Sequence, residues 1–272
     1  MAFSYFHRPG DLPAASSRLE ALGKKAAALA GGTSLVLRRW AGIEHLVDLS
    51  SLGLDQLLPH RIGAMVTLSQ LEYYKESNPA LDLLKSAAAR AASELLRNQA
   101  TVGGSALICC RWSDLLAPLL ALNASFGFYG PQGERSLSAA ELYCRKKPLR
   151  VIDPGELLIH LDLPEGVESQ AFCKFGMNSF SHAIWDVAVV FKDGRHFLAV
   201  SAGSSMPKRL PMLETKLDAL GSKLSLQEIT SSVEEEIQGG NLVITATSLY
   251  PKEYRRKVLP VFIFDTLEKF GR

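Results

Sequence analysis

The sequence lacks the features that mark several common functional classes. None of its four cysteines forms a C-x-x-C pair, and no spacing typical of a zinc or iron–sulfur site occurs. No apolar run approaches the roughly 20 residues that span a bilayer, and residues 1–9 lack the apolar core of a signal peptide. The formal net charge is only +2, without a long basic run. We therefore expect a cytoplasmic protein with no metal site, no membrane span and no nucleic-acid partner.

The cysteines have two interpretations. They stand at positions 109, 110, 144 and 173. Adjacent Cys109 and Cys110 are compatible with a redox pair, but buried free thiols are the favoured interpretation because unpaired cysteine behaves as a small apolar residue.

Two glycine loops stand out among the features that are present. The first contains Ala30, Gly31, Gly32, Thr33, Ser34 and Leu35, and the second contains Thr101, Val102, Gly103, Gly104 and Ser105. Paired glycines let backbone N–H groups approach a ligand that a Cβ atom would hold away, and a helical turn opening there favours phosphate. Neither loop matches the dinucleotide fingerprint or the P-loop, so a simple Gly-Gly turn stays an alternative.

The chain is long enough for two modest domains, with 47% hydrophobic residues to supply their cores. Capping boxes beginning at Thr67, Ser138 and Ser225 predict three helix starts, and Asp193-Gly194 predicts a hairpin turn. We place a domain boundary after residue 166, where a Pro-Glu-Gly sequence ends a strand. Before it we expect helices over 11–23, 68–77, 80–96 and 115–122 and strands over 26–29, 45–49, 61–66, 125–130 and 157–163; after it we expect antiparallel strands over 170–175, 185–192 and 196–202 and helices over 212–220, 226–237 and 252–270.

Three side chains receive specific expectations. Ser113 is a candidate N-cap for the helix over 115–122, and Asp114 then has a structural explanation in the helix dipole. Trp185 is expected in the core or at an interface rather than beside a cofactor. Residues 254–256 are expected to form a solvated helix face.

With both loops in view, the chain resembles the FAD-binding subunit of molybdenum hydroxylases, the family of xanthine dehydrogenase, aldehyde oxidase and carbon monoxide dehydrogenase. The resemblance covers nearly the whole chain. It is carried by Phe3-x-Tyr5-x-x-Arg8-Pro9, both glycine loops, Ser113-Asp114-Leu115, Glu156-Leu157-Leu158, Ala171-Phe172-x-Lys174, Gly203-x-x-x-Pro207-x-Arg209 and Tyr254-Arg255-Arg256.

The resemblance implies an α+β fold, with a two-part FAD-binding domain of the PCMH type over residues 1–166. A C-terminal α/β sandwich domain like that of carbon monoxide dehydrogenase flavoproteins would occupy residues 167–272. It further implies that the two loops hold the FAD pyrophosphate, that Asp114 binds a cofactor hydroxyl or the adenosine side, that Leu158 packs on the cofactor and that Lys174 lies near the flavin. No residue of this chain is assigned a catalytic role, because the chemistry belongs to the cofactor.

The implied function is electron transfer within a larger enzyme. Electrons from a molybdopterin-binding large subunit would cross 2Fe–2S clusters on an iron–sulfur subunit, reach this FAD and pass to NAD or another acceptor. Two alternatives stay open: a stand-alone flavin-dependent reductase or oxidase, and a flavin-free scaffold. The scaffold alternative rests on Ser34 and Ser105, which stand where many family members have Asp and Asn.

Overall fold

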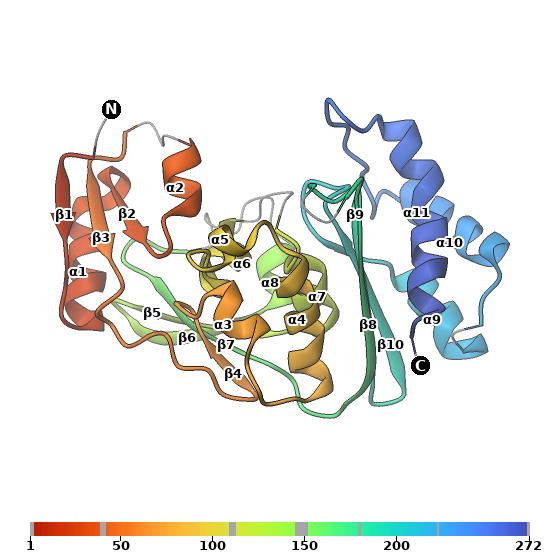
Figure 1. Cartoon of the computed structure of the whole chain (residues 1–272), viewed down its shortest axis with the longest axis horizontal. Helices are drawn as coiled ribbons and strands as arrows, with labels where there is room; N and C mark the ends of the chain where they lie inside the picture. Colours follow the sequence, from red (N-terminus) through yellow and green to blue (C-terminus); the bar gives the residue numbers. More distant parts are fainter. Residues whose placement is uncertain are drawn as a thin grey trace.

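The computed structural model describes residues 3–38, 42–108, 113–144, 152–178, 181–221 and 223–270. Within these ranges the chain forms three sheets with helices packed around them, and Figure 1 shows them in a row from the N-terminal lobe to the C-terminal helices. The predicted α+β fold is confirmed. Within those ranges, no helix has both the length and the apolar composition that crossing a membrane requires.

The N-terminal lobe is a small parallel sheet with strand order β1-β3-β2. Its first helix begins where Asp11 accepts a hydrogen bond from the Ala14 N–H group at 2.8 Å and ends at Gly23, as predicted. Ala15 and Val47 are buried between helix and sheet. The elements of this lobe are β1 (Tyr5–His7), α1 (Leu12–Leu22), a 3₁₀ turn η1 (Gly23–Lys25), β2 (Ala26–Leu29), α2 (Thr33–Arg38) and β3 (His45–Asp48).

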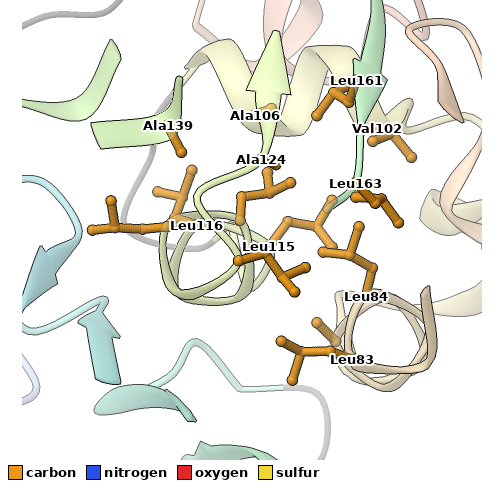
Figure 2. Close-up of a cluster of buried hydrophobic side chains, with 14 of the residues drawn as sticks. Leu83, Leu84, Val102, Ala106, Leu115, Leu116, Ala124, Ala139, Leu161 and Leu163 are labelled. Carbon is orange, nitrogen blue, oxygen red and sulfur yellow. The ribbon is translucent and has the colours of Figure 1, made fainter. Parts of the chain in front are cut away.

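The second lobe is an antiparallel sheet with strand order β4-β7-β5-β6, covered by short helices. Its main core lies between that sheet and two helices, where Leu84, Leu115 and Leu163 converge (Figure 2). The capping boxes predicted at Thr67 and Ser138 are both present. The elements are β4 (Arg61–Gly63), α3 (Leu68–Glu72), α4 (Pro79–Arg90), α5 (Glu94–Arg97), α6 (Val102–Ile108), α7 (Leu116–Ala121), β5 (Ser125–Gly130), β6 (Gly133–Ser138), α8 (Ala139–Tyr143) and β7 (Leu157–Asp162).

The single helix predicted over residues 80–96 is wrong. The chain breaks after α4, with Ala92 at φ 45°, and restarts at α5, where the Ser93 side chain caps the new helix. The buried Arg97 guanidinium donates to the carbonyls of Ala91 and Ala92 and pairs with Glu72 at 2.8 Å. The Arg97 guanidinium thus satisfies the carbonyl groups where α4 ends, and it stabilises the break between α4 and α5.

The C-terminal part is built on a third, antiparallel sheet with strand order β11-β10-β9-β8. Asp193 and Gly194 both have positive φ, 51° and 72°, as a type I′ hairpin requires. The predicted hairpin is therefore confirmed. The elements are β8 (Val167–Phe175), β9 (Trp185–Lys192), β10 (Arg195–Ser201), β11 (Lys208–Arg209), α9 (Pro211–Leu220), α10 (Leu226–Gln238) and α11 (Lys252–Leu267).

Both faces of this third sheet are covered. Helices α4 and α7 of the second lobe pack on one face, and α9 and α11 pack on the other (Figure 1). Because side chains alternate along a strand, Phe172 and Ala188 join the core of the second lobe, whereas Val187 and Leu198 join the C-terminal core. The third sheet thus contributes to the cores of both the second lobe and the C-terminal part. The domain boundary after residue 166 stays a prediction.

Arg255 is buried rather than part of a solvated helix face, so that expectation is wrong for this residue. Its guanidinium donates to the Ala202 and Thr245 carbonyls, each at 3.1 Å. The Trp185 indole donates in turn to the Arg255 carbonyl at 3.0 Å, and the predicted core position of Trp185 is confirmed. Arg255 therefore anchors α11 to the end of the third sheet.

The third predicted capping box begins α10, where Ser225 accepts from the Glu228 N–H group and the Glu228 carboxylate accepts from Ser225. We expect Ser225→Ala to lower the free energy of unfolding by about 1 kcal/mol, because one helical N–H group loses its acceptor. Urea unfolding measures this loss. Ser225→Thr, which keeps the hydroxyl, is the control, and equal stability of the Ala and Thr variants would contradict the prediction.

Candidate functional site

The first glycine loop contacts the residues that lead directly into the second. Strand β2 ends at Leu29, and the first loop then lies against the segment that leads into the second. A Cβ atom at Gly31 would lie 1.7 Å from the Gln99 carbonyl oxygen and 3.3 Å from the Ala100 Cα. Only glycine permits this approach of two backbones. The geometry therefore places the first loop beside the start of the second.

The first loop presents unused backbone donors. Gly32 has φ 70°, which turns the chain from Ala30 into helix α2. The first N–H groups of a helix have no acceptor within it, and among the described residues no other acceptor satisfies the N–H groups from Gly31 to Leu35. The Ser34 Oγ atom is also buried without a hydrogen-bond partner there. The loop thus has N–H groups and a hydroxyl ready for an anionic or polar ligand.

The second loop differs because its amides are already used. The Val102 and Gly103 N–H groups donate to the carbonyls of Val66 and Ala64, and those of Gly104 and Ser105 donate to Thr101. A Cβ atom at Gly103 would lie 2.7 Å from the Ala64 carbonyl oxygen. The backbone of this loop is consequently held by the second lobe, and Gly104 and Ser105 are its half-buried members.

Ser113 fixes the second loop rather than capping a helix. Its Oγ donates to the Ser105 carbonyl at 2.8 Å, and helix α7 begins after Leu115 without a side-chain cap. The predicted N-cap role is wrong, because the Ser113 hydroxyl is bonded to the Ser105 carbonyl instead of to a helical N–H group. The resulting bond holds Asp114 next to the loop.

Asp114 and Lys174 form a buried ion pair between the two halves of the chain. The Lys174 Nζ atom lies 3.0 Å from Asp114 Oδ2 and also donates to the Arg90 carbonyl at 2.8 Å. The other carboxylate oxygen, Asp114 Oδ1, is buried without a partner among the described residues. An ammonium group has three donors, so each member of the pair keeps one hydrogen-bonding position open.

Burial dominates the electrostatics of this pair. It raises the pKa of Asp114 to about 6, although the charge and hydrogen bond of Lys174 act in the opposite direction. The structure also reveals a second buried acid, Asp186, which lies opposite Lys174 in the β8–β9 register. Burial, followed by the charge of Asp114, raises its pKa well above the usual range.

The sequence reasoning missed Asp186. Its signal is a lone acid inside the apolar run of residues 185–191, on a strand that is otherwise buried. A charged side chain in such a position needs a partner or a proton. That pattern identifies a buried acid, but it does not identify the residues around it.

Leu158 and the cysteines are the remaining residues named from the sequence. Leu158 is buried in the core and pairs with Phe128 across strands β7 and β5; its contact with a cofactor stays a prediction. Cys173 is buried, Cys144 is exposed, and Cys109 and Cys110 lie outside the described residues. In the described ranges, no three His, Cys, Asp or Glu side chains are grouped as metal ligands.

These features fit the FAD expected from the sequence. Buried polar atoms almost always have partners in native proteins, so Ser34 Oγ and Asp114 Oδ1 are available for hydrogen bonds to a ligand. Free N–H groups beside a glycine pair suit a diphosphate, and a carboxylate oxygen suits a ribityl or ribose hydroxyl.

Comparison with known proteins supports the same assignment. Residues 1–166 match the family model of the FAD binding domain in molybdopterin dehydrogenase. The carbon monoxide dehydrogenase medium chain of Afipia carboxidovorans is 28% identical over 97% of this chain and 95% of its own. The 6-hydroxypseudooxynicotine dehydrogenase complex subunit alpha of Paenarthrobacter nicotinovorans is 29% identical over 91% and 87%.

A solved structure extends the similarity over the whole chain. The reconstituted carbon monoxide dehydrogenase from Oligotropha carboxidovorans superposes with a TM-score of 0.86 at 25% identity, covering 98% of this chain and 97% of that one. The match includes the third sheet and its helices as well as the two N-terminal lobes. The chain is thus an FAD-binding oxidoreductase subunit and belongs to the family of FAD-binding domains in molybdopterin dehydrogenases.

Proposed function

We propose that this chain is the electron-transfer subunit of a molybdenum hydroxylase complex, passing electrons from iron–sulfur clusters on a partner subunit through its FAD to NAD or another acceptor. A molybdopterin-binding large subunit would supply the electrons. The observation that carries the proposal is the contact of the first glycine loop with the residues leading into the second, whose last residue, Ser105, is bonded to Ser113 next to the buried Asp114–Lys174 pair. Two relatives are themselves named as a medium chain and as a subunit of a dehydrogenase complex.

The roles of the first loop follow from its free donors. The N–H groups from Gly31 to Leu35 would bind the FAD pyrophosphate, with Ser34 Oγ as an additional polar contact. Ala30 brings the chain to this turn, and Thr33 and Leu35 belong to the first turn of α2.

The second loop has a supporting role in this proposal. Because the amides of Val102 and Gly103 are occupied, residues 101–103 would shape the pocket, and Gly104 and Ser105 would make the closer approach to FAD. Leu158 lies on β7 next to Ile159. The Ile159 carbonyl accepts a hydrogen bond from the Ala64 N–H group, and Ala64 packs against Gly103. Leu158 would therefore support the cofactor side of the core.

The buried pair would orient the rest of the cofactor. Asp114 Oδ1 would accept from a cofactor hydroxyl, and the third N–H of Lys174 would face the flavin ring. Bound FAD supplies the redox chemistry; the chain supplies binding, orientation and a positive charge next to the ring. In this scheme residues 1–166 form the FAD-binding domain, and residues 167–272 contribute Lys174 from the second domain.

The first experiment is the visible spectrum of the purified chain, with the cofactor released by heat and identified. We expect flavin absorption and close to one FAD per chain. A colourless protein that refuses added FAD would overturn the proposal and favour the scaffold alternative.

The acceptor is then tested on the same preparation. The flavin is reduced chemically without oxygen and mixed with NAD, with a quinone or with oxygen, and its reoxidation is followed. Reoxidation by NAD supports NAD as acceptor, whereas reoxidation only by another compound assigns that class instead. Turnover of a reducible or oxidisable organic substrate by the chain alone would favour the stand-alone reductase or oxidase.

A further inference from the structure

A column of polar side chains crosses the inner face of the third sheet. Lys174 on β8, Asp186 on β9 and Ser201 on β10 are successive partners in the strand register. Their neighbours on the same face, Phe172 and Ala188, are apolar and belong to the core of the second lobe. The column therefore lies in an environment where unpaired charge is costly.

Together with Asp114, which pairs with Lys174, the column forms a cluster of two acids and one base, whose charges do not balance if every group is ionised. Among the described residues Lys174 is the one cation of this cluster, and its Nζ atom is committed to Asp114 and to the Arg90 carbonyl. Asp186 is fully buried and receives a hydrogen bond only from Ser201, at 3.2 Å, while its Oδ1 atom has no partner among the described residues. One proton on Asp186 makes the cluster neutral.

The proton has a definite place because the two acids differ. Asp114 has the ammonium group at 3.0 Å and ionises first, with a pKa of about 6. Its charge then adds to burial in holding the proton on Asp186, whose pKa is raised well above normal. The groups that face Asp186 in the described chain are Lys174 from β8, Ser201 from β10 and Asp114 from the segment before α7.

We propose that Asp186 is a positioning residue of the flavin pocket. As a neutral acid it does not attract the Lys174 ammonium group, which then interacts with Asp114 and FAD. As a carboxylate it competes with them for that ammonium group. This role rests on the proposed function, because it requires FAD beside Lys174. When Asp186 ionises, its negative charge offsets the positive charge of Lys174. The attraction between Lys174 and an anionic cofactor then decreases.

The test is the pH dependence of the dissociation constant of FAD, measured on the full chain from about pH 7, above the titration of Asp114, up to the highest pH at which the chain stays folded. We expect wild-type affinity to fall by up to about tenfold per pH unit where Asp186 ionises, because one proton is linked to binding. Asp186→Asn keeps the shape of the neutral acid and cannot ionise. Its affinity should stay constant over this range and remain within about twofold of the wild type at the lower end.

Two further variants complete the test. Asp193→Asn makes the same chemical change in the exposed hairpin of the same sheet and should follow the wild-type profile. Ser201→Ala removes the hydrogen bond that favours the carboxylate, so the fall in affinity should move to higher pH. This second variant keeps the proposal testable if Asp186→Asn does not fold.

Parallel pH profiles for the wild type and Asp186→Asn, or an unmoved profile for Ser201→Ala, would overturn the role of Asp186 while leaving FAD binding intact. Absence of FAD binding by the wild type at every pH would instead overturn the proposed function and, with it, this role. The two failures are thus distinguishable.

Discussion

Gly31→Ala is expected to raise the dissociation constant of FAD by at least about 100-fold, which corresponds to about 2.7 kcal/mol. The new Cβ atom would lie 1.7 Å from the Gln99 carbonyl oxygen and 2.7 Å from its carbonyl carbon. Both are backbone atoms and cannot rotate away, so the first loop must move away from the residues that lead into the second. Separation moves the N–H groups of the first loop away from their positions relative to Asp114.

The measurement is fluorescence titration of the FAD-free chain, with circular dichroism to verify the fold. Gly10→Ala is a matched control, because a Cβ atom there has no neighbour within 4 Å and the residue lies outside both loops. Gly104→Ala is an intermediate case, since its Cβ atom would meet only the Thr101 hydroxyl at 2.9 Å. Wild-type affinity in Gly31→Ala would show that this contact of the first loop is unnecessary for binding.

Lys174→Met is expected to lower the free energy of unfolding by about 3–5 kcal/mol at neutral pH, because it leaves the Asp114 charge buried without its cation. The Lys174 side chain is only 7% exposed and that of Asp114 only 1%, so water cannot replace the lost partner. The same substitution removes the positive charge proposed to face the flavin. Affinity for FAD should therefore fall together with stability.

The pH dependence of this defect has a defined sign. Loss of the ammonium group raises the pKa of Asp114 further in the folded state, above the value of about 6 that burial already produces. A raised folded-state pKa gives stability that is present in acid and lost as the pH rises through that pKa. The deficit of Lys174→Met should consequently be small near the unfolded pKa of aspartate, about 4, and grow toward neutrality.

Urea unfolding at acid and neutral pH measures this trend. Lys192→Met is the matched control: Lys192 lies on the same sheet, but its partner Asp193 is exposed and 3.8 Å away, so little stability should be lost. The double variant Asp114→Asn/Lys174→Met should recover part of the loss, because no buried charge remains. Equal deficits for Lys174→Met and Lys192→Met would show that the buried pair does not contribute to stability.

Local features of the fold were predictable from the sequence. The capping boxes, the Asp193-Gly194 hairpin and the strand before the first glycine loop each depend on residues close together in the chain. The physical cause acts within a few residues, so the pattern alone is sufficient. The family resemblance added the fold class and the position of the cofactor domain.

Features set by distant contacts were not predictable in the same way. The break at Ala92 depends on Arg97 finding Glu72 across 25 residues, and Ser113 bonds back to Ser105 instead of capping α7. Both local patterns were compatible with a helix or a cap, and tertiary contacts decided against them. Asp186 was missed for the same reason: its significance depends on Lys174 and on Asp114, 72 positions before it.

The third sheet, which packs against both halves, limits how the two halves can be recombined in evolution. Cut away from the rest, residues 1–166 would leave the outer surfaces of α4 and α7 in water, and the C-terminal sheet would lose the cover of its inner face. Exposed apolar area of that kind promotes aggregation. Gene fusion or domain shuffling would therefore have to transfer both halves together. Residues 1–166 alone would not be a stable unit for such a transfer.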